Sequence, residues 1–304
     1  MTDNRAKLKI ALTPILALGL LAGTGFLGGK IYNRINRDIF HPSRGEVLKK
    51  TPESYGLSYD RVEFKTGNGI TLKGWYLPAR NQGKNDCVIL APGKGENRWD
   101  MLQYAPFLVQ AGFDVLLFDP RSTGLSGGDR YGFGFFESRD LSVATDYVLE
   151  EKNVDEVALL GRSAGATASL LAARRNSSIE AVVADSPFAN LKLASKDFGS
   201  YSSDVTLQLF FPVYMFAART ALGVDIYRKT NILKTITEVT VPVFFIHGLK
   251  DEGIGYQNSQ KLFDRKKPPK KLWLVPETDH VKAFDNKKGS YTRKVVDFLT
   301  KWLQ

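Results

Sequence analysis

The chain has 304 residues, and 43% of them are hydrophobic, which is enough apolar material for a sizeable core. The formal net charge is +10, but the basic residues are scattered rather than gathered with stacking aromatic side chains, so the sequence predicts no nucleic-acid binding. The short basic runs are typical of solvated faces, with attraction to an anionic membrane surface as the alternative. A single cysteine, Cys87, excludes an intrachain disulfide.

The first 29 residues have the pattern of a membrane anchor. A basic region, residues 1–9, precedes an uncharged apolar run, residues 10–29, that is long enough to span a bilayer. The run is longer than a typical signal-peptide core and no clear cleavage pattern follows it, so an uncleaved signal anchor is favoured over a cleaved signal peptide. Basic residues flank both ends, so the positive-inside rule does not decide the orientation. We expect a single-pass protein of the cell membrane whose folded part lies outside the cytoplasm.

Residues 30–59 form a polar connector, and residues 60–304 are the expected folded domain. Two alternating segments around Gly67-Asn68-Gly69 predict a β-hairpin at the start of a sheet. Strand and helix patterns then alternate, which predicts a mostly parallel sheet with helices on both faces. The expected strands are 61–66, 70–77, 87–91, 113–119, 156–161, 181–185, 241–247 and 271–275. The expected helices are 97–111, 138–151, 164–175, 256–265 and 290–303.

The most informative motif is Gly161-Arg162-Ser163-Ala164-Gly165, which lies between an apolar strand pattern and an Ala-rich helix pattern. A serine at such a strand–turn–helix connection stands above the edge of the sheet, where a base can reach it. Gly161 and Gly165 are small enough to let the strand and the helix approach closely. The pattern therefore predicts that Ser163 is a nucleophile.

A serine hydroxyl needs a positioned base to accept its proton, and the chain has three histidines. His280 follows a late strand and a turn, so it is the predicted base. His247 ends a strand, and the favoured interpretation is a structural histidine bonded to a neighbouring loop. His41 precedes the first expected strand and is a poor candidate.

The base in turn needs an acid that fixes its tautomer and stabilises the imidazolium. Asp251 lies four residues after His247, just beyond the end of a strand, and is the predicted acid. Glu252 lies beside it, and Asp185, at the end of an earlier strand, is an alternative position. The amides of Ala164 and Lys94 are the predicted oxyanion donors. A plain Gly/Pro turn is the alternative for the loop that carries Lys94.

These blocks together resemble the α/β-hydrolase superfamily, specifically the serine hydrolases of the Bem46-like and serine-aminopeptidase-like groups. The matching stretches are 91–95, 118–127, 161–165, 247–251 and 278–280. The resemblance covers residues 60–304 and implies an α/β-hydrolase fold with an eight-stranded, mostly parallel sheet and a helical cap after strand six. There are two departures from the superfamily pattern. Pro92 replaces a usual histidine, and Ser122-Thr123 lie where a glycine is common.

Residues 187–238 interrupt the alternation of strands and helices and are too long for a simple loop. They lie where the superfamily inserts its cap. The favoured interpretation is a helical lid whose apolar underside shapes an acyl or other hydrophobic pocket. The alternatives are a helix packed permanently on the core and a face that enters the bilayer.

The predicted function is that of a membrane-anchored serine hydrolase that cleaves an ester or related acyl bond of a small-molecule or lipid-like substrate. No metal or organic cofactor is expected, because the sequence has no clustered His/Cys ligand set and no phosphate loop. One alternative is a serine aminopeptidase-like peptidase that presents Glu252, Asp225 or Glu137 to the substrate amine. The other is a non-catalytic, membrane-tethered binding protein.

Overall fold

The computed structural model describes residues 29, 44, 50–79, 85–201 and 211–303, without the side chains of residues 198–201. Among these residues, no helix is both long enough and apolar enough to cross a membrane. The expected basic region and the expected anchor lie outside the described residues, apart from Gly29.

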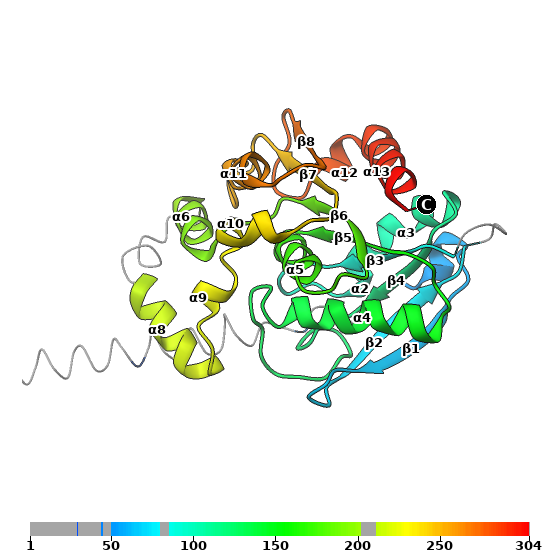
Figure 1. The fold of residues 1–304 in the computed structure, drawn as a ribbon, viewed down its shortest axis with the longest axis horizontal. Helices are drawn as coiled ribbons and strands as arrows, with labels where there is room; N and C mark the ends of the chain where they lie inside the picture. Colours follow the sequence, from blue (N-terminus) through cyan, green and yellow to red (C-terminus); the bar gives the residue numbers. More distant parts are fainter. Residues whose placement is uncertain (1–28, 30–43, 45–49, 80–84, 202–210, 304) are drawn as a thin grey trace, which may run out of the picture.

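Eight strands form one sheet in the order β1-β2-β4-β3-β5-β6-β7-β8 (Figure 1). The first two strands form an antiparallel hairpin, β2 pairs antiparallel with β4, and every other neighbouring pair is parallel. The predicted eight-stranded, mostly parallel sheet is thus confirmed. The strands are β1 (Asp60–Lys65), β2 (Thr71–Leu77), β3 (Cys87–Ala91), β4 (Asp114–Phe118), β5 (Val157–Arg162), β6 (Ile179–Asp185), β7 (Val243–Gly248) and β8 (Lys270–Val275).

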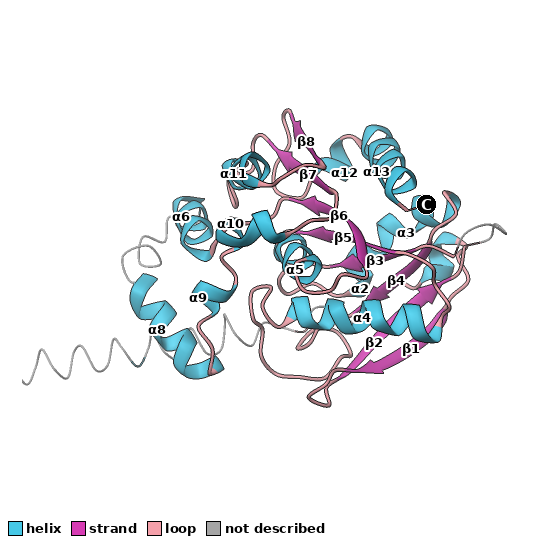
Figure 2. Cartoon of the chain, viewed as in Figure 1, coloured by secondary structure: helices cyan, strands magenta, loops and turns pink. Residues whose placement is uncertain are grey.

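Helices cover both faces of the sheet (Figure 2). Side chains alternate between the faces of a strand, so in β5 Val157 and Leu159 join one core cluster while Ala158 and Leu160 join the other. One face packs against α4 (Glu137–Glu151), α5 (Ala164–Ala173) and α11 (Gln257–Arg265). The other packs against α2 (Arg98–Met101), η3 (Leu102–Tyr104), α3 (Ala105–Gln110), α12 (Ala283–Asn286) and α13 (Lys288–Trp302).

The helix expected over residues 97–111 is divided into α2, η3 and α3. Pro106 lies in the first turn of α3. Proline has no amide hydrogen, so it fits the start of a helix but breaks a continuous one. The short elements still bury Met101, Leu102 and Leu108 against the sheet.

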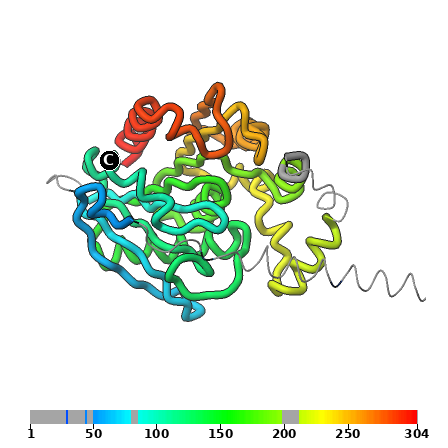
Figure 3. Tube along the Cα trace, turned by 180° about the vertical axis from the view of Figure 1, so that it is seen from behind, coloured from blue at the N-terminus to red at the C-terminus, as the bar shows by residue number. Residues whose placement is uncertain are grey.

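The segment between β6 and β7 is helical, and in Figures 1 and 3 its first helices lie together at one end of the molecule. Its later part, α10 and η4, packs into the main core through Ile232 and Ile236, on the same face as α5. The elements are α6 (Leu191–Tyr201), α8 (Phe211–Leu222), α9 (Ile226–Lys229), α10 (Ile232–Thr235) and η4 (Ile236–Glu238).

Candidate active site

Ser163 occupies the single residue between β5 and α5 and has a φ of 53° and a ψ of −122°. A positive φ is unfavourable for a residue with a side chain, so the surroundings must hold it. The Ser163 amide donates to the Asp185 carbonyl of the next strand at 2.8 Å, and the Ser163 carbonyl accepts from Thr167 at 3.2 Å. These bonds hold the backbone of Ser163 in this conformation.

The two glycines of the motif are required by close backbone contacts. A Cβ atom at Gly165 would lie 2.2 Å from the Ala91 carbonyl oxygen, and one at Gly161 would lie 2.5 Å from the Gly165 oxygen. Both distances are far below van der Waals contact, so strand and helix approach as closely as they do only because these positions lack a side chain.

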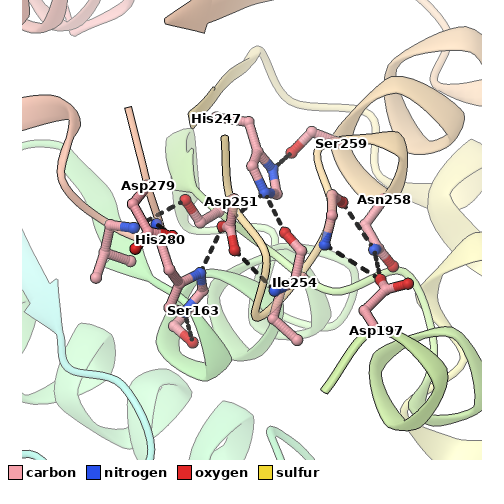
Figure 4. Close-up of polar contacts among 12 residues, drawn as sticks. Ser163, Asp197, His247, Asp251, Ile254, Asn258, Ser259, Asp279 and His280 are labelled. Atoms are coloured by element: carbon pink, nitrogen blue, oxygen red, sulfur yellow. Dashed lines mark hydrogen bonds and ion pairs between the residues drawn. The ribbon is translucent and has the colours of Figure 1, made fainter. Parts of the chain in front are cut away.

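The structure brings Ser163, Asp251 and His280 together at the carboxyl edge of the sheet, after β5, β7 and β8 respectively (Figure 4). His280 Nε2 lies 2.9 Å from Ser163 Oγ, and His280 Nδ1 lies 2.6 Å from Asp251 Oδ2. The alternative acid, Asp185, instead accepts a hydrogen bond from the Ser186 hydroxyl at 3.0 Å. The arrangement is therefore that of a serine, an oriented base and a buried acid.

The electrostatics of this chain of residues suit a proton transfer near neutral pH. Burial raises the pKa of the Asp251 carboxyl, but hydrogen bonds with His247 and His280 and the charges of both rings outweigh burial and leave the pKa below its usual value. Burial lowers the pKa of His280, but the Asp251 hydrogen bond and charge, with smaller contributions from Asp185 and Glu96, raise it above the ordinary value. Asp251 is thus kept ionised beside a strengthened base.

His247 is bonded to a neighbouring loop, as the sequence predicts for a structural histidine. Its Nε2 atom lies 2.7 Å from the Ile254 carbonyl oxygen, and its Nδ1 atom lies 2.6 Å from the Ser259 hydroxyl. The sequence interpretation missed a third contact, because Nε2 is also 3.0 Å from Asp251 Oδ2. The four-residue spacing between His247 and Asp251 after a strand is a signal that could have indicated this contact.

The loop after β3 lies against the nucleophile elbow. A Cβ atom at Gly93 would lie 3.4 Å from Ser163 Cβ. Sequence reasoning overlooked Glu96 in this loop. Its Oε2 atom accepts from the Gly93 amide at 2.6 Å and from Arg162 Nε at 2.8 Å, and Arg162 Nη2 lies 2.7 Å from Oε1. A two-pronged carboxylate–guanidinium pair therefore joins the loop to the elbow.

The predicted oxyanion donors lie on these two segments. Ala164 is the first residue of α5, and its side chain is buried. Lys94 lies beside Gly93, and its ammonium group is 5.1 Å from the centre of the Phe133 ring. The assignment of their amides to an oxyanion hole stays a prediction.

The second departure from the superfamily pattern has a local explanation. Ser122 adopts a φ of 64°, and its amide donates to the Gly127 carbonyl at 2.9 Å. A left-handed backbone favours glycine, which explains why glycine is common at this position. The same loop is held by Arg121, whose guanidinium bonds the buried Asp140 carboxylate.

Known proteins are similar to this chain in sequence and in fold. Residues 82–214 match a family model described as serine aminopeptidase, S33. The Pyrococcus furiosus esterase Pf2001 has a similar structure, with a TM-score of 0.72 and 24% identity, and the alignment covers 86% of this chain and all of that one. The chain therefore has the fold of the α/β-hydrolases, and residues 82–214 resemble the serine aminopeptidase family.

Curated relatives are similar to the chain along most of their length. The protein YqkD of Bacillus subtilis is 24% identical over 298 residues, which is 94% of this chain and 96% of that protein. YNL320W of Saccharomyces cerevisiae, described as a membrane protein, is 24% identical over 273 residues, which is 86% of this chain and 88% of that protein.

An apolar cluster lies at the start of α5 and joins the sheet to the helices that precede β7. Ala164 and Phe188 meet residues of α8 and α9 in this cluster. Ile254, from the loop that carries Asp251, packs against its side. Its buried members are Tyr131, Phe135, Ala164, Phe188, Leu191, Tyr214, Ala218, Leu222 and Ile226. The cluster places aromatic and aliphatic side chains around the residue that follows the nucleophile.

The peptidase alternative requires a carboxylate that is available to bind a substrate amine, and the three candidates lie in different surroundings. Glu137 is buried, where it accepts from the amides of Gly132 and Gly134, and burial raises the pKa of its carboxyl to about 7. Asp225 accepts from the Arg228 amide at the start of α9, and Glu252 is exposed. Within the described residues, no group of three or more His, Cys, Asp or Glu side chains could hold a metal ion.

Proposed function

We propose that this hydrolase cleaves esters or related acyl bonds through a covalent acyl-enzyme formed on Ser163. The observation that carries the proposal is the hydrogen-bonded chain from Ser163 Oγ to His280 Nε2, at 2.9 Å, and from His280 Nδ1 to Asp251 Oδ2, at 2.6 Å. Both distances lie within the reach needed for proton transfer and for tautomer control.

In the first step, His280 takes the proton of the Ser163 hydroxyl as its oxygen attacks the substrate carbonyl carbon. Asp251 accepts the Nδ1–H of His280 and stabilises the imidazolium that forms. The amides of Ala164 and Lys94 donate to the oxyanion. His280 then passes its proton to the leaving alcohol as the carbon–oxygen bond breaks. Water, activated by His280 in the same way, releases the acid and restores Ser163.

The surroundings of Ser163 favour an apolar acyl group over an N-terminal amine. The cluster around Ala164 is built from aromatic and aliphatic side chains. The carboxylate of Glu96, in the loop that lies against the elbow, is engaged by the Gly93 amide and by Arg162, so its charge is already compensated. A substrate ammonium would have to compete with that guanidinium. The expected substrates are small-molecule or lipid-like acyl compounds, and the aminopeptidase alternative is tested by the same substrate panel.

We further propose that residues 10–29 anchor the hydrolase in the cell membrane, with the catalytic domain outside the cytoplasm. The uncharged apolar run in the sequence and the membrane description of the yeast relative support the anchor. The orientation is proposed because short N-terminal anchors commonly export the domain that follows them. The full chain should sediment with membranes, and its Ser163 should react with an impermeant probe on intact cells. A full chain found only in the soluble fraction would contradict the anchor. Labelling only after lysis would show that the catalytic domain lies inside the cell.

The deciding experiment treats the full chain with a fluorophosphonate probe, beside Ser163→Ala and the control Ser195→Ala, a serine on α6. Labelling should vanish in Ser163→Ala alone, and a panel of p-nitrophenyl esters and aminoacyl anilides should show turnover of the esters. Labelling that persists in Ser163→Ala would exclude Ser163 as the nucleophile. A folded, unlabelled protein would favour the non-catalytic binding protein, and anilide turnover would favour the peptidase.

A further inference from the structure

Two histidines, not one, contact the carboxylate of Asp251. His280 approaches Oδ2 from the loop after β8 at 2.6 Å, and His247 approaches the same oxygen from the end of β7 at 3.0 Å (Figure 4). The other oxygen, Oδ1, accepts from the Ile254 amide at 2.7 Å. Figure 4 shows His247 on the far side of Asp251 from Ser163, so it is out of reach of a substrate on the nucleophile.

The neighbours of His247 define its tautomer. Nε2 faces two acceptors, the Asp251 carboxylate and the Ile254 carbonyl, so Nε2 must carry a hydrogen. In the neutral ring, Nδ1 is then an acceptor for the Ser259 hydroxyl, 2.6 Å away on α11. Ser259 is fully buried, and so is His247. A serine on a helix of the main core thus holds the ring in the orientation that presents Nε2–H to the acid.

We propose that His247 is a positioning residue for the proposed hydrolytic reaction, and that it holds Asp251 in the place and charge state in which that acid orients His280. Ser259 fixes the ring of His247, so the functional chain runs through five side chains, from Ser259 to Ser163. The inference rests on the proposed function, because its effect is read through the reactivity of Ser163.

The need for such a residue follows from the burial of Asp251. The side chain of Asp251 has no solvent exposure, so water cannot stabilise its charge or limit its rotation. Removal of His247 would leave the carboxylate with the Ile254 amide and His280 as its partners. A buried acceptor that loses a donor is costly, and a carboxylate that turns or takes up a proton cannot stabilise the imidazolium.

The charged groups around His247 come from three elements. Asp251 lies on the loop after β7, His280 lies on the loop after β8, and Asp185 lies at the end of β6, close enough for its charge to interact with both rings. Ser259 from α11 contributes a neutral hydroxyl. A change at His247 therefore reaches Ser163 through Asp251 and His280.

The test compares His247→Leu and His247→Gln in the full chain, with turnover of a p-nitrophenyl ester expressed per site titrated by the fluorophosphonate probe. Leucine removes the donor, and kcat should fall about 30-fold. Glutamine carries an amide nitrogen that can take the place of Nε2–H, and kcat should stay within about threefold of the unaltered protein. Because Asp251 without this donor turns or takes up a proton, it stabilises the His280 imidazolium less, and the pKa of His280 falls. The ascending limb of kcat/KM should therefore move to lower pH in His247→Leu and return in His247→Gln.

Ser259→Ala keeps His247 and should lower kcat by about threefold, whereas Thr145→Val, which removes a buried hydroxyl bonded within α4, should leave kcat unchanged. If His247→Leu does not fold, the comparison of Ser259→Ala with Thr145→Val decides the matter. Equal kcat in leucine and glutamine variants, a limb that does not move, or a limb that moves to higher pH would overturn the role of His247. An unaltered protein that is neither labelled nor active would overturn the proposed function itself.

Discussion

The nucleophile elbow and the cap helix α8 meet in one apolar cluster, but their backbones are held in different ways. Every residue of α5 is buried, and the elbow is fixed by backbone contacts with neighbouring strands. Helix α8 buries Tyr214 and Ala218, but its other side exposes 47% of Val213 and 73% of Phe216. The proposed reacting groups therefore lie on the tightly packed edge of the sheet, and the proposed acyl side lies partly on a less tightly held element.

Hydrogen bonds also tie the helices before β7 to the loop that follows β7. Asp197 of α6 accepts from the Gly255 amide at 3.2 Å and from the Asn258 side chain at 2.8 Å, and thereby ties the first cap helix to the loop of the acid. Asn258 also accepts from the Ala189 amide after β6. Substitutions in the elbow should therefore affect the reaction itself, and substitutions in α8 should affect which substrate is bound.

The largest expected effect is at the acid. Asp251→Asn removes the negative charge that fixes the tautomer of His280, and turnover should fall about 10⁴-fold. Asp185→Asn is the matched variant, because Asp185 is equally buried but bonds Ser186. Ester turnover per titrated site is the measurement. Near-normal turnover of Asp251→Asn, with loss of turnover in Asp185→Asn, would show that Asp185 at the end of β6 is the acid.

The next effect concerns the elbow backbone. Gly165→Ala places a Cβ atom 2.2 Å from the Ala91 carbonyl oxygen, so the free energy of unfolding should fall by about 3 kcal/mol and labelling of Ser163 should slow. Gly289→Ala, on α13, meets nothing within 4 Å and should change stability by less than about 1 kcal/mol. Urea denaturation measures both. Equal stabilities would show that the strand and helix can separate without cost.

A smaller effect is expected in the cap. Tyr214→Ala empties part of the cluster around Ala164 and should cost about 3 kcal/mol of stability. The KM for long-chain esters should rise more than the KM for acetyl esters, because the lost side chain lies on the proposed acyl side. Phe216→Ala, on the exposed side of α8, should change both quantities little. An equal change in KM for long-chain and acetyl esters would show that Tyr214 does not select the substrate.

The smallest effect is a shift in pH dependence. Because His280 reacts in its neutral form and its pKa is raised, activity should be lost as the pH falls through a value above the usual histidine pKa. Glu96→Gln removes a negative charge that raises this pKa but keeps an acceptor for the Gly93 amide, so the limb of kcat/KM should move to lower pH. Glu252→Gln is the exposed control. A limb in Glu96→Gln that stays in place or moves upward would contradict the electrostatic role of Glu96.

The sequence by itself predicted the elements that depend on local patterns. The apolar run from Val157 to Leu160, followed by Gly161 to Gly165 and an Ala-rich stretch, predicted strand, turn and helix, because this backbone geometry tolerates only small neighbours. The hairpin at Gly67 to Gly69 and the parallel sheet followed in the same way from residue type and period. The proximity of Ser163 to His280 was expected because carboxyl ends of parallel strands share one edge.

Only the tertiary structure decided which side chains from separate elements meet. Glu96 and Arg162 are 66 residues apart, and their pairing depends on β3 and β5 being neighbours in the sheet. The contact of His247 with Ser259 depends on how α11 packs against β7, and the division of the cap between the main core and the cluster at Ala164 depends on the volume left between helices. Such contacts follow from strand order and packing, which a local sequence pattern does not encode.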